Sequence, residues 1–191
     1  MSRIVYLFPG QGAQAVGMGK ALYDQFDEAK EVYRAAKRRL GKDIAALCFE
    51  GPPEALADTA TCQPALFATS LAAYAVWQKL VPASVTPLAA AGLSLGELSA
   101  LAAARVFSLE DGCYLVEARG HAMAECAAKS RGAMLAVIGL GAEAVEALCR
   151  DSGAWGRTTT RRIRWCSPAP WRPLGRRKRW PRSGEPSGPS S

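Results

Sequence analysis

A serine between two glycines is the feature of this sequence that points most directly to chemistry. Gly92, Ser94 and Gly96 fit the pattern G-x-S-x-G, which is typical of a nucleophile elbow, a sharp strand-to-helix turn with serine at its tip. Glycine suits both flanks because a Cβ in so tight a turn would clash. The N-terminus of the following helix favours negative charge developing on a substrate oxygen. The pattern therefore predicts Ser94 as a nucleophile.

The same residues also have interpretations without chemistry. Ser94 and Glu97 fit the S-x-x-E capping box, which only closes the first turn of a helix, and G-x-S-x-G arises by chance in an alanine-rich chain. The glycines of Pro9-Gly10-Gln11-Gly12 either let the backbone approach a ligand or form an ordinary β-to-α turn. Taken alone, Arg119 is a solvated helix residue. From the residues themselves, these alternatives stay open.

The elements that must position these residues alternate between strand and helix. Apolar runs predict strands at 4–8, 85–91 and 132–139. Helical spacing or capping residues predict helices that begin at Val16 and at 61–64, where Pro64 lies in the first turn. Further helices are predicted at 29–40, closed by Gly41, at 95–106, from Ser108 to about Ala128, and at 142–150. This alternation argues for an α/β fold with a mostly parallel sheet. After Trp155 we find no strand or helix pattern.

Composition separates the body of the chain from its tail. The 191 residues suffice for one domain with a core, and no apolar run is long enough to cross a bilayer. Residues 1–156 hold 14 basic and 16 acidic side chains, whereas residues 157–191 hold ten Lys or Arg and one acid. Six cysteines without a C-x-x-C pair, beside one histidine, make a metal site unexpected. We interpret most of the cysteines as reduced core residues of a cytoplasmic protein.

Several stretches together resemble the malonyl-CoA:acyl-carrier-protein transacylase family. In order along residues 4 to about 155 they are Leu7 to Gln14 with Val16 to Gly19, Gln63 to Leu66, Gly92 to Glu97, Val116 to Gly120 with Met123, and Gly132 to Met134 with Ile138 to Leu140. The resemblance implies part of an α/β-hydrolase-like, parallel-sheet acyltransferase domain. Residues 1–129 would form the N-terminal part of the catalytic domain, and residues 130–155 would begin an incomplete ferredoxin-like small subdomain.

The resemblance also implies a role for each site residue. Ser94 would attack the malonyl thioester, coenzyme A would leave, and the acyl carrier protein would then take the malonyl group. The backbone N–H groups of Gln11 and Leu95 would form the oxyanion hole. Arg119 would grip the free malonyl carboxylate, since a guanidinium can bind both carboxylate oxygens. Malonyl-CoA and acyl carrier protein would be the partners, with no cofactor, no metal, no nucleic acid and no membrane.

Two departures from the family bear on activity. Leu93 stands where the family usually has a histidine that is not the base. The family's general base is a histidine well downstream of the small subdomain, whereas the single histidine here is His121, which we interpret as a surface residue on another helix face from Arg119. We therefore expect no general base and little transfer by this chain itself. Alternatives are a serine esterase, which has no use for Arg119, a non-catalytic carrier-protein-binding module, and a nucleic-acid-binding protein acting through the basic tail.

The composition of the tail, residues 156–191, predicts a disordered segment, and we interpret its sequence as the product of out-of-frame reading. Six of the 12 prolines, three of the five tryptophans and Gly175-Arg176-Arg177-Lys178-Arg179 lie there, and such a composition cannot bury enough apolar surface to order itself. Arg, Pro, Gly, Ser and Trp are also what a GC-rich gene yields when it is read out of frame.

Reading the gene in its other two frames tests this origin. We expect an Asn- and Gly-containing loop segment soon after the codon for Trp155, followed later by a segment that carries the missing histidine. If neither frame encodes such segments, the frameshift idea fails and the tail is a genuine part of the protein.

Overall fold

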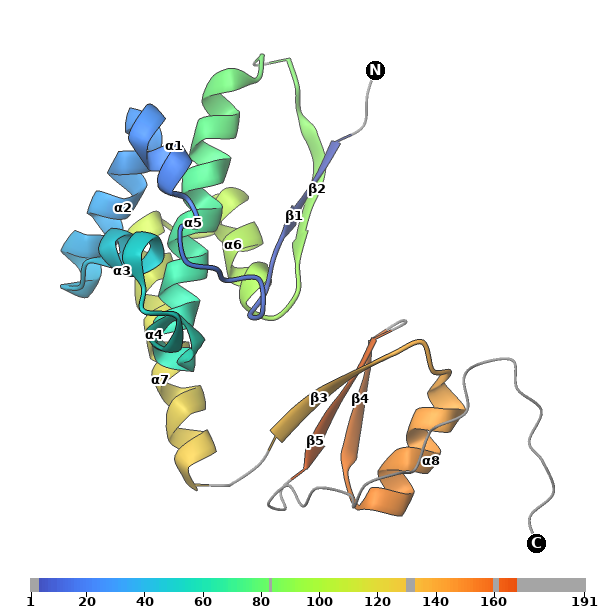
Figure 1. Ribbon diagram of the computed structural model, residues 1–191. Coiled ribbons are helices and arrows are strands. Elements are labelled where there is room, and N and C mark those ends of the chain that lie inside the picture. The colour runs from blue at the N-terminus through green and yellow to red at the C-terminus, as the bar shows by residue number, and fades with distance from the viewer. Residues whose placement is uncertain (1–3, 83, 130–132, 160–161, 168–191) are drawn as a thin grey trace, which may run out of the picture. The chain divides into compact units, whose positions relative to one another are not determined.

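A computed structural model describes residues 4–82, 84–129, 133–159 and 162–167, and these form two compact units, Met1–Glu125 and Cys126–Ser191 (Figure 1). Each unit is described by itself. The remaining residues, among them most of the basic tail and Gly132 at the start of a predicted strand, lie outside the described part of the chain.

A two-stranded parallel sheet anchors the first unit. Strand β1 is Ile4–Phe8 and β2 is Pro87–Gly92, and their register pairs Phe8 with Gly92. Parallel strands end at the same edge of a sheet, so the loops that follow β1 and β2 begin side by side. Helix α6, Leu95–Ala103, continues directly from the β2 turn and packs against both strands.

Helix α5, Thr59–Leu80, is the centre of the first unit (Figure 1). It packs against α6 and against four shorter N-terminal helices, α1 Lys20–Gln25, α2 Asp27–Leu40, α3 Ile44–Glu50 and α4 Pro53–Ala57. Buried residues line most of its length, which fits an apolar helix enclosed by others. Helix α7, Leu109–Lys129, meets α5 at Gly112, where an added Cβ would lie 2.3 Å from the Phe67 ring.

The second unit is an antiparallel three-stranded sheet with one helix. Its elements are β3 Ala133–Ile138, α8 Ala142–Ser152, β4 Trp155–Thr159 and β5 Arg162–Ser167, and the strand order is β3-β5-β4. Both neighbours run antiparallel to β5, so β3 and β4 are parallel with β5 between them. This split β-α-β arrangement, followed by one more strand, is the opening part of a ferredoxin-like subdomain.

Strands β4 and β5 correct the expectation that regular structure stops after Trp155. The residues of β5 alternate between basic and apolar from Arg162 to Trp165, a period of two that is typical of a strand, and threonines close β4. The high arginine content obscured this pattern. The tail beyond Ser167 lies outside the described residues, so its predicted disorder is untested.

Several boundaries in the first unit also differ from prediction. Helix α5 begins at Thr59, capped by Asp58, so Pro64 lies inside the helix instead of in its first turn. Helix α6 ends at Ala103 and not near Val106, and helices α3 and α4 carry too few residues to show a clear period. The left-handed Gly41 cap and the Ser108 cap, whose Oγ accepts from the Asp111 N–H, are confirmed.

The Asp58 cap gives a stability prediction. Its carboxylate accepts from the Thr61 backbone N–H at 3.1 Å and from the Thr61 hydroxyl at 3.2 Å. Replacing an N-cap aspartate by alanine costs about 1 kcal/mol, so we expect Asp58→Ala to lower the unfolding free energy by that amount in urea titrations followed by circular dichroism. Asp24→Ala is the control, because Asp24 forms only an exposed ion pair with Lys20. Equal stability of the two variants would contradict the role of the cap.

Candidate active site

The turn after β2 has the backbone geometry of a nucleophile elbow. Ser94 has φ 58° and ψ −109°, a conformation that costs a non-glycine residue about 1–3 kcal/mol. An added Cβ on Gly92 would lie 2.0 Å from the backbone carbonyl of Gly96, and one on Gly96 would lie 2.2 Å from the Phe8 carbonyl oxygen. Both glycines of the motif are therefore required by contact, and the strained residue at the tip is Ser94.

The Ser94 side chain does not cap helix α6. It forms no capping hydrogen bond, and its Oγ accepts a hydrogen bond of 2.8 Å from Arg119 Nη2. The capping-box interpretation of Ser94 and Glu97 is therefore wrong. The serine hydroxyl instead faces a cation that comes from a different helix.

Arg119 reaches the elbow from α7 and is held there by α5. Its Nη1 donates to Gln63 Oε1 at 2.7 Å while its Nη2 contacts Ser94. Close helix packing makes this reach possible, because a Cβ on the adjacent Gly120 would lie only 3.0 Å from the Ala60 Cα. Arg119 is half-buried, so the interpretation of it as a solvated helix residue is wrong.

The loop after β1 lies against the elbow. A Cβ on Gly10 would lie 2.6 Å from the Leu93 carbonyl oxygen, so the two loops are in backbone contact. Gln11 follows in that loop, and its Nε2 donates to Thr59 Oγ1 at 3.2 Å. Leu95 is buried at the first position of α6. The four predicted site residues thus lie on segments that meet at the carboxyl edge of the parallel strands, where α/β proteins bind ligands.

His121 lies away from this chemistry. Its side chain is 61% exposed and its Nε2 is 4.0 Å from Glu117 Oε1, a carboxylate that also pairs with Lys42 at 2.9 Å. Leu93 is 45% exposed beside the elbow. Within the described residues, the hydrogen-bond partner of the Ser94 hydroxyl is Arg119 and not a histidine.

The cysteines whose side chains the structure describes offer no competing buried nucleophile. Cys48, Cys62 and Cys113 are buried free thiols, as predicted, whereas Cys126 is exposed and Cys149 is half-buried. Burial raises the pKa of the Cys62 thiol to about 11 and that of Cys113 to about 12, so both stay protonated and poorly nucleophilic at neutral pH. No cluster of three or more possible metal ligands occurs among the described residues, and none of their helices could span a membrane.

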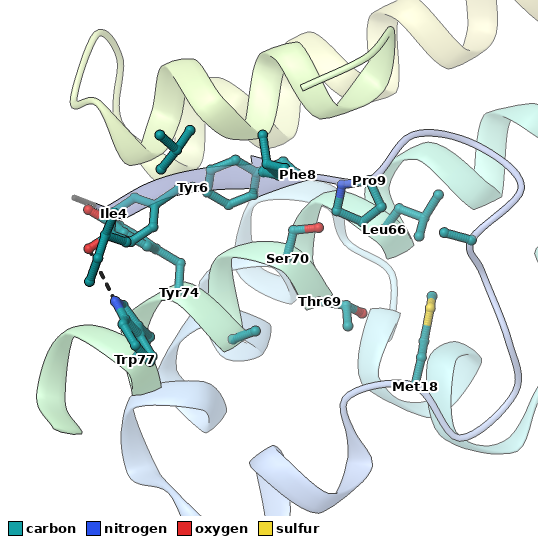
Figure 2. A pocket seen from close by; sticks show the side chains of 14 residues that line it. Ile4, Tyr6, Phe8, Pro9, Met18, Leu66, Thr69, Ser70, Tyr74 and Trp77 are labelled. Atoms are coloured by element: carbon teal, nitrogen blue, oxygen red, sulfur yellow. Dashed lines mark hydrogen bonds between the residues drawn. The ribbon is translucent and has the colours of Figure 1, made fainter. Parts of the chain in front are cut away.

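A separate apolar pocket lies between β1 and α5. Its volume is about 530 Å³, and Figure 2 shows Tyr6 and Phe8 of β1 facing Thr69, Ser70 and Tyr74 of α5 across it. None of the four predicted site residues lines this pocket.

Sequence reasoning missed two contributors to the site. Gln63 was noted only as part of a stretch that resembles the family. Its amide lies inside the apolar run from Cys62 to Ala68, and this was a signal, because a buried amide needs a hydrogen-bond partner. Thr59, which accepts from Gln11, gave no signal because it stands outside the predicted helix.

Residues 5–153 match the acyl transferase domain family. The chain belongs to this family. A malonyl CoA-acyl carrier protein transacylase of Bacillus subtilis is 45% identical over 146 residues, which are 76% of this chain and 45% of that relative. The acyltransferase fold is equally clear in solved structures. The malonyl CoA-acyl carrier protein transacylase of Clostridium perfringens matches with a TM-score of 0.76 at 37% identity. The match covers 86% of this chain and 53% of the transacylase chain.

A second solved acyltransferase relative is a malonyl-transacylase in complex with a type II PKS acyl-carrier protein. It has a TM-score of 0.78 at 35% identity and covers 86% of this chain and 55% of that chain. The chain thus spans about half the length of the relatives it matches.

The contact between Gly92 and Gly96 gives a prediction specific to the elbow. A Cβ at Gly92 overlaps backbone atoms, which no side-chain rotation relieves, so we expect Gly92→Ala to cost about 3 kcal/mol or more, as severe overpacking does. Thermal melting measures the loss. The neighbouring exposed Ala91 supplies the control, since Ala91→Ser adds similar bulk toward solvent. If the Gly92→Ala and Ala91→Ser proteins have the same melting temperature, the turn tolerates a side chain at position 92 and the prediction is wrong.

Proposed function

We propose that this chain carries the acyl-binding part of a malonyl-CoA:acyl-carrier-protein transacylase site. The observation that supports it most is the hydrogen bond of 2.8 Å between Arg119 Nη2 and Ser94 Oγ. In malonyl-CoA the free carboxylate is one methylene away from the thioester carbonyl. An acyl group on Ser94 would therefore present its carboxylate to a guanidinium that already lies beside the nucleophile.

The proposed reaction has two steps. Ser94 Oγ attacks the thioester carbonyl, the C–S bond breaks, and coenzyme A leaves with the proton that the serine gives up. The thiol of the acyl carrier protein then attacks the malonyl-serine ester, and the C–O bond breaks to return the hydroxyl. The N–H groups of Gln11 and Leu95 would stabilise the oxyanion in both steps. The coenzyme A thioester is a substrate, so the reaction needs no cofactor, and we place it in the cytoplasm.

The chain lacks an identified general base to activate Ser94. Arg119 favours the ionised form of Ser94 by donating to its oxygen, but it cannot accept the proton. Without a general base the rate falls by about 10²–10⁴. The described residues give Ser94 no histidine partner, so we expect slow acylation and little transfer from the chain alone.

The alternatives fit the site less well. A serine esterase would leave the anchored guanidinium beside Ser94 without a purpose. A carrier-protein-binding module remains the second candidate, since one solved relative is bound to an acyl-carrier protein.

The family match ends at residue 153, which supports our proposal that the sequence changes character near Trp155. Strands β4 and β5 nevertheless pair in the same sheet as β3, in the order β3-β5-β4.

Intact-mass spectrometry tests the proposed function. Incubated with excess malonyl-CoA, the chain should slowly acquire one malonyl group, and Ser94→Ala should acquire none. With acetyl-CoA we expect slower labelling, because the acetyl group has no carboxylate for Arg119. Arg119→Ala should lower the ratio of the labelling rates with malonyl-CoA and acetyl-CoA about tenfold or more. A tenfold loss corresponds to one charge-assisted hydrogen bond.

Lys129→Ala is the matched control, since it removes a cation from the far end of the same helix. Equal labelling by the two thioesters in the unsubstituted chain, or labelling that survives Ser94→Ala, would refute the assignment.

A further inference from the structure

Gln63 is an amide buried inside an apolar helix. It is fully buried, as are its neighbours Cys62 and Ala65. Among the described residues, only Gln63 and Ser99 are buried with polar side chains. Burying an amide costs several kcal/mol unless its hydrogen bonds are met, so the two bonds of Gln63 explain why the position tolerates it.

Those bonds fix which way the amide faces. Gln63 Oε1 accepts from Arg119 Nη1 at 2.7 Å, and Gln63 Nε2 donates to Met123 Sδ at 3.2 Å. A guanidinium has only donors and a thioether sulfur only accepts. Rotating the amide by 180° would place donor against donor at Arg119, so the observed orientation is the one the chemistry allows. Met123, one turn further along α7 than Arg119, thus orients the amide that holds the arginine.

A neutral acceptor leaves the charge of Arg119 uncompensated. Among the described residues, no carboxylate lies within ion-pair distance of the guanidinium, in contrast to Lys20, Lys37 and Lys42, which all have acidic partners. A glutamate in place of Gln63 would still accept from the guanidinium, but it would cancel the charge of Arg119 and place an acceptor against the Met123 sulfur. An amide provides the geometric anchor without competing for that charge.

We propose that Gln63 is a positioning residue for substrate selection. It anchors one arm of Arg119 so that the uncompensated guanidinium stays beside Ser94 and selects an acyl group with a terminal carboxylate. This inference rests on the proposed function, because it takes Arg119 to be the carboxylate-binding residue.

The test is the ratio of dissociation constants for acetyl-CoA and malonyl-CoA, measured by isothermal titration calorimetry on the full chain. The two ligands differ only in the carboxylate, so the ratio reports on its recognition. We expect Gln63→Leu, which keeps the volume but removes the acceptor, to lower the ratio at least tenfold. Gln63→Glu should lower the ratio similarly, because the buried carboxylate competes with the ligand for Arg119.

Ser99→Ala is the matched control, since Ser99 is the other buried polar residue and its Oγ has no hydrogen-bond partner. It should leave the ratio unchanged. A purely structural role for Gln63 would weaken both ligands equally in Gln63→Leu, and that result overturns the inference. If Gln63→Leu does not fold, Gln63→Glu decides alone, and an unchanged ratio overturns the inference.

Arg119→Ala separates the two proposals. If it leaves the ratio unchanged, Arg119 does not bind the carboxylate and the proposed function fails. If Arg119→Ala removes the malonyl preference while both Gln63 variants keep it, the proposed function stands and the positioning role of Gln63 fails.

Discussion

Backbone contact at the carboxyl ends of β1 and β2 is the constraint on which the site depends. Gly96 lies against the Phe8 carbonyl, Gly92 against Gly96, and Gly10 against the Leu93 carbonyl, so three segments meet with no side chain between them. This contact fixes the strained turn at Ser94 and holds the Gln11 loop beside it. A nucleophile at the end of a parallel strand is thus positioned by the main chain itself.

Helices α5 and α7 add the charged part of the site to this frame. Glycine again allows the approach, since Gly112 faces Phe67 and Gly120 faces Ala60 across the two helices. The spacing brings a cation from α7 and its amide anchor from α5 to one hydroxyl. Charge and nucleophile come from segments far apart in the sequence, so the site forms only when the first unit is folded.

The parts of the site that the sequence could predict are the local ones. The elbow around Ser94 and strand β1 follow from short motifs whose geometry depends on neighbouring residues. The Arg119–Gln63 contact depends on how two helices pack, which no spacing along the chain reveals. The start of α5 differs from prediction because a proline is typical of the first turn of a helix. The Asp58 cap starts α5 at Thr59, so Pro64 lies in the second turn. Strand β5 was missed because its arginines resembled a solvated tail.

The open face of the parallel sheet has a consequence for handling the protein. Parallel strands are normally covered on both faces, yet Val5 is 46%, Leu7 77% and Leu88 69% exposed. Within the described residues, β1 pairs only with β2, so its second edge presents backbone donors and acceptors to other chains. Residues 1–156, which carry this face, are almost neutral, and the basic residues 157–191 supply the positive charge of the whole chain, so repulsion between copies depends on the tail. An exposed apolar face beside an unpaired strand edge therefore favours association between copies as the protein concentration rises.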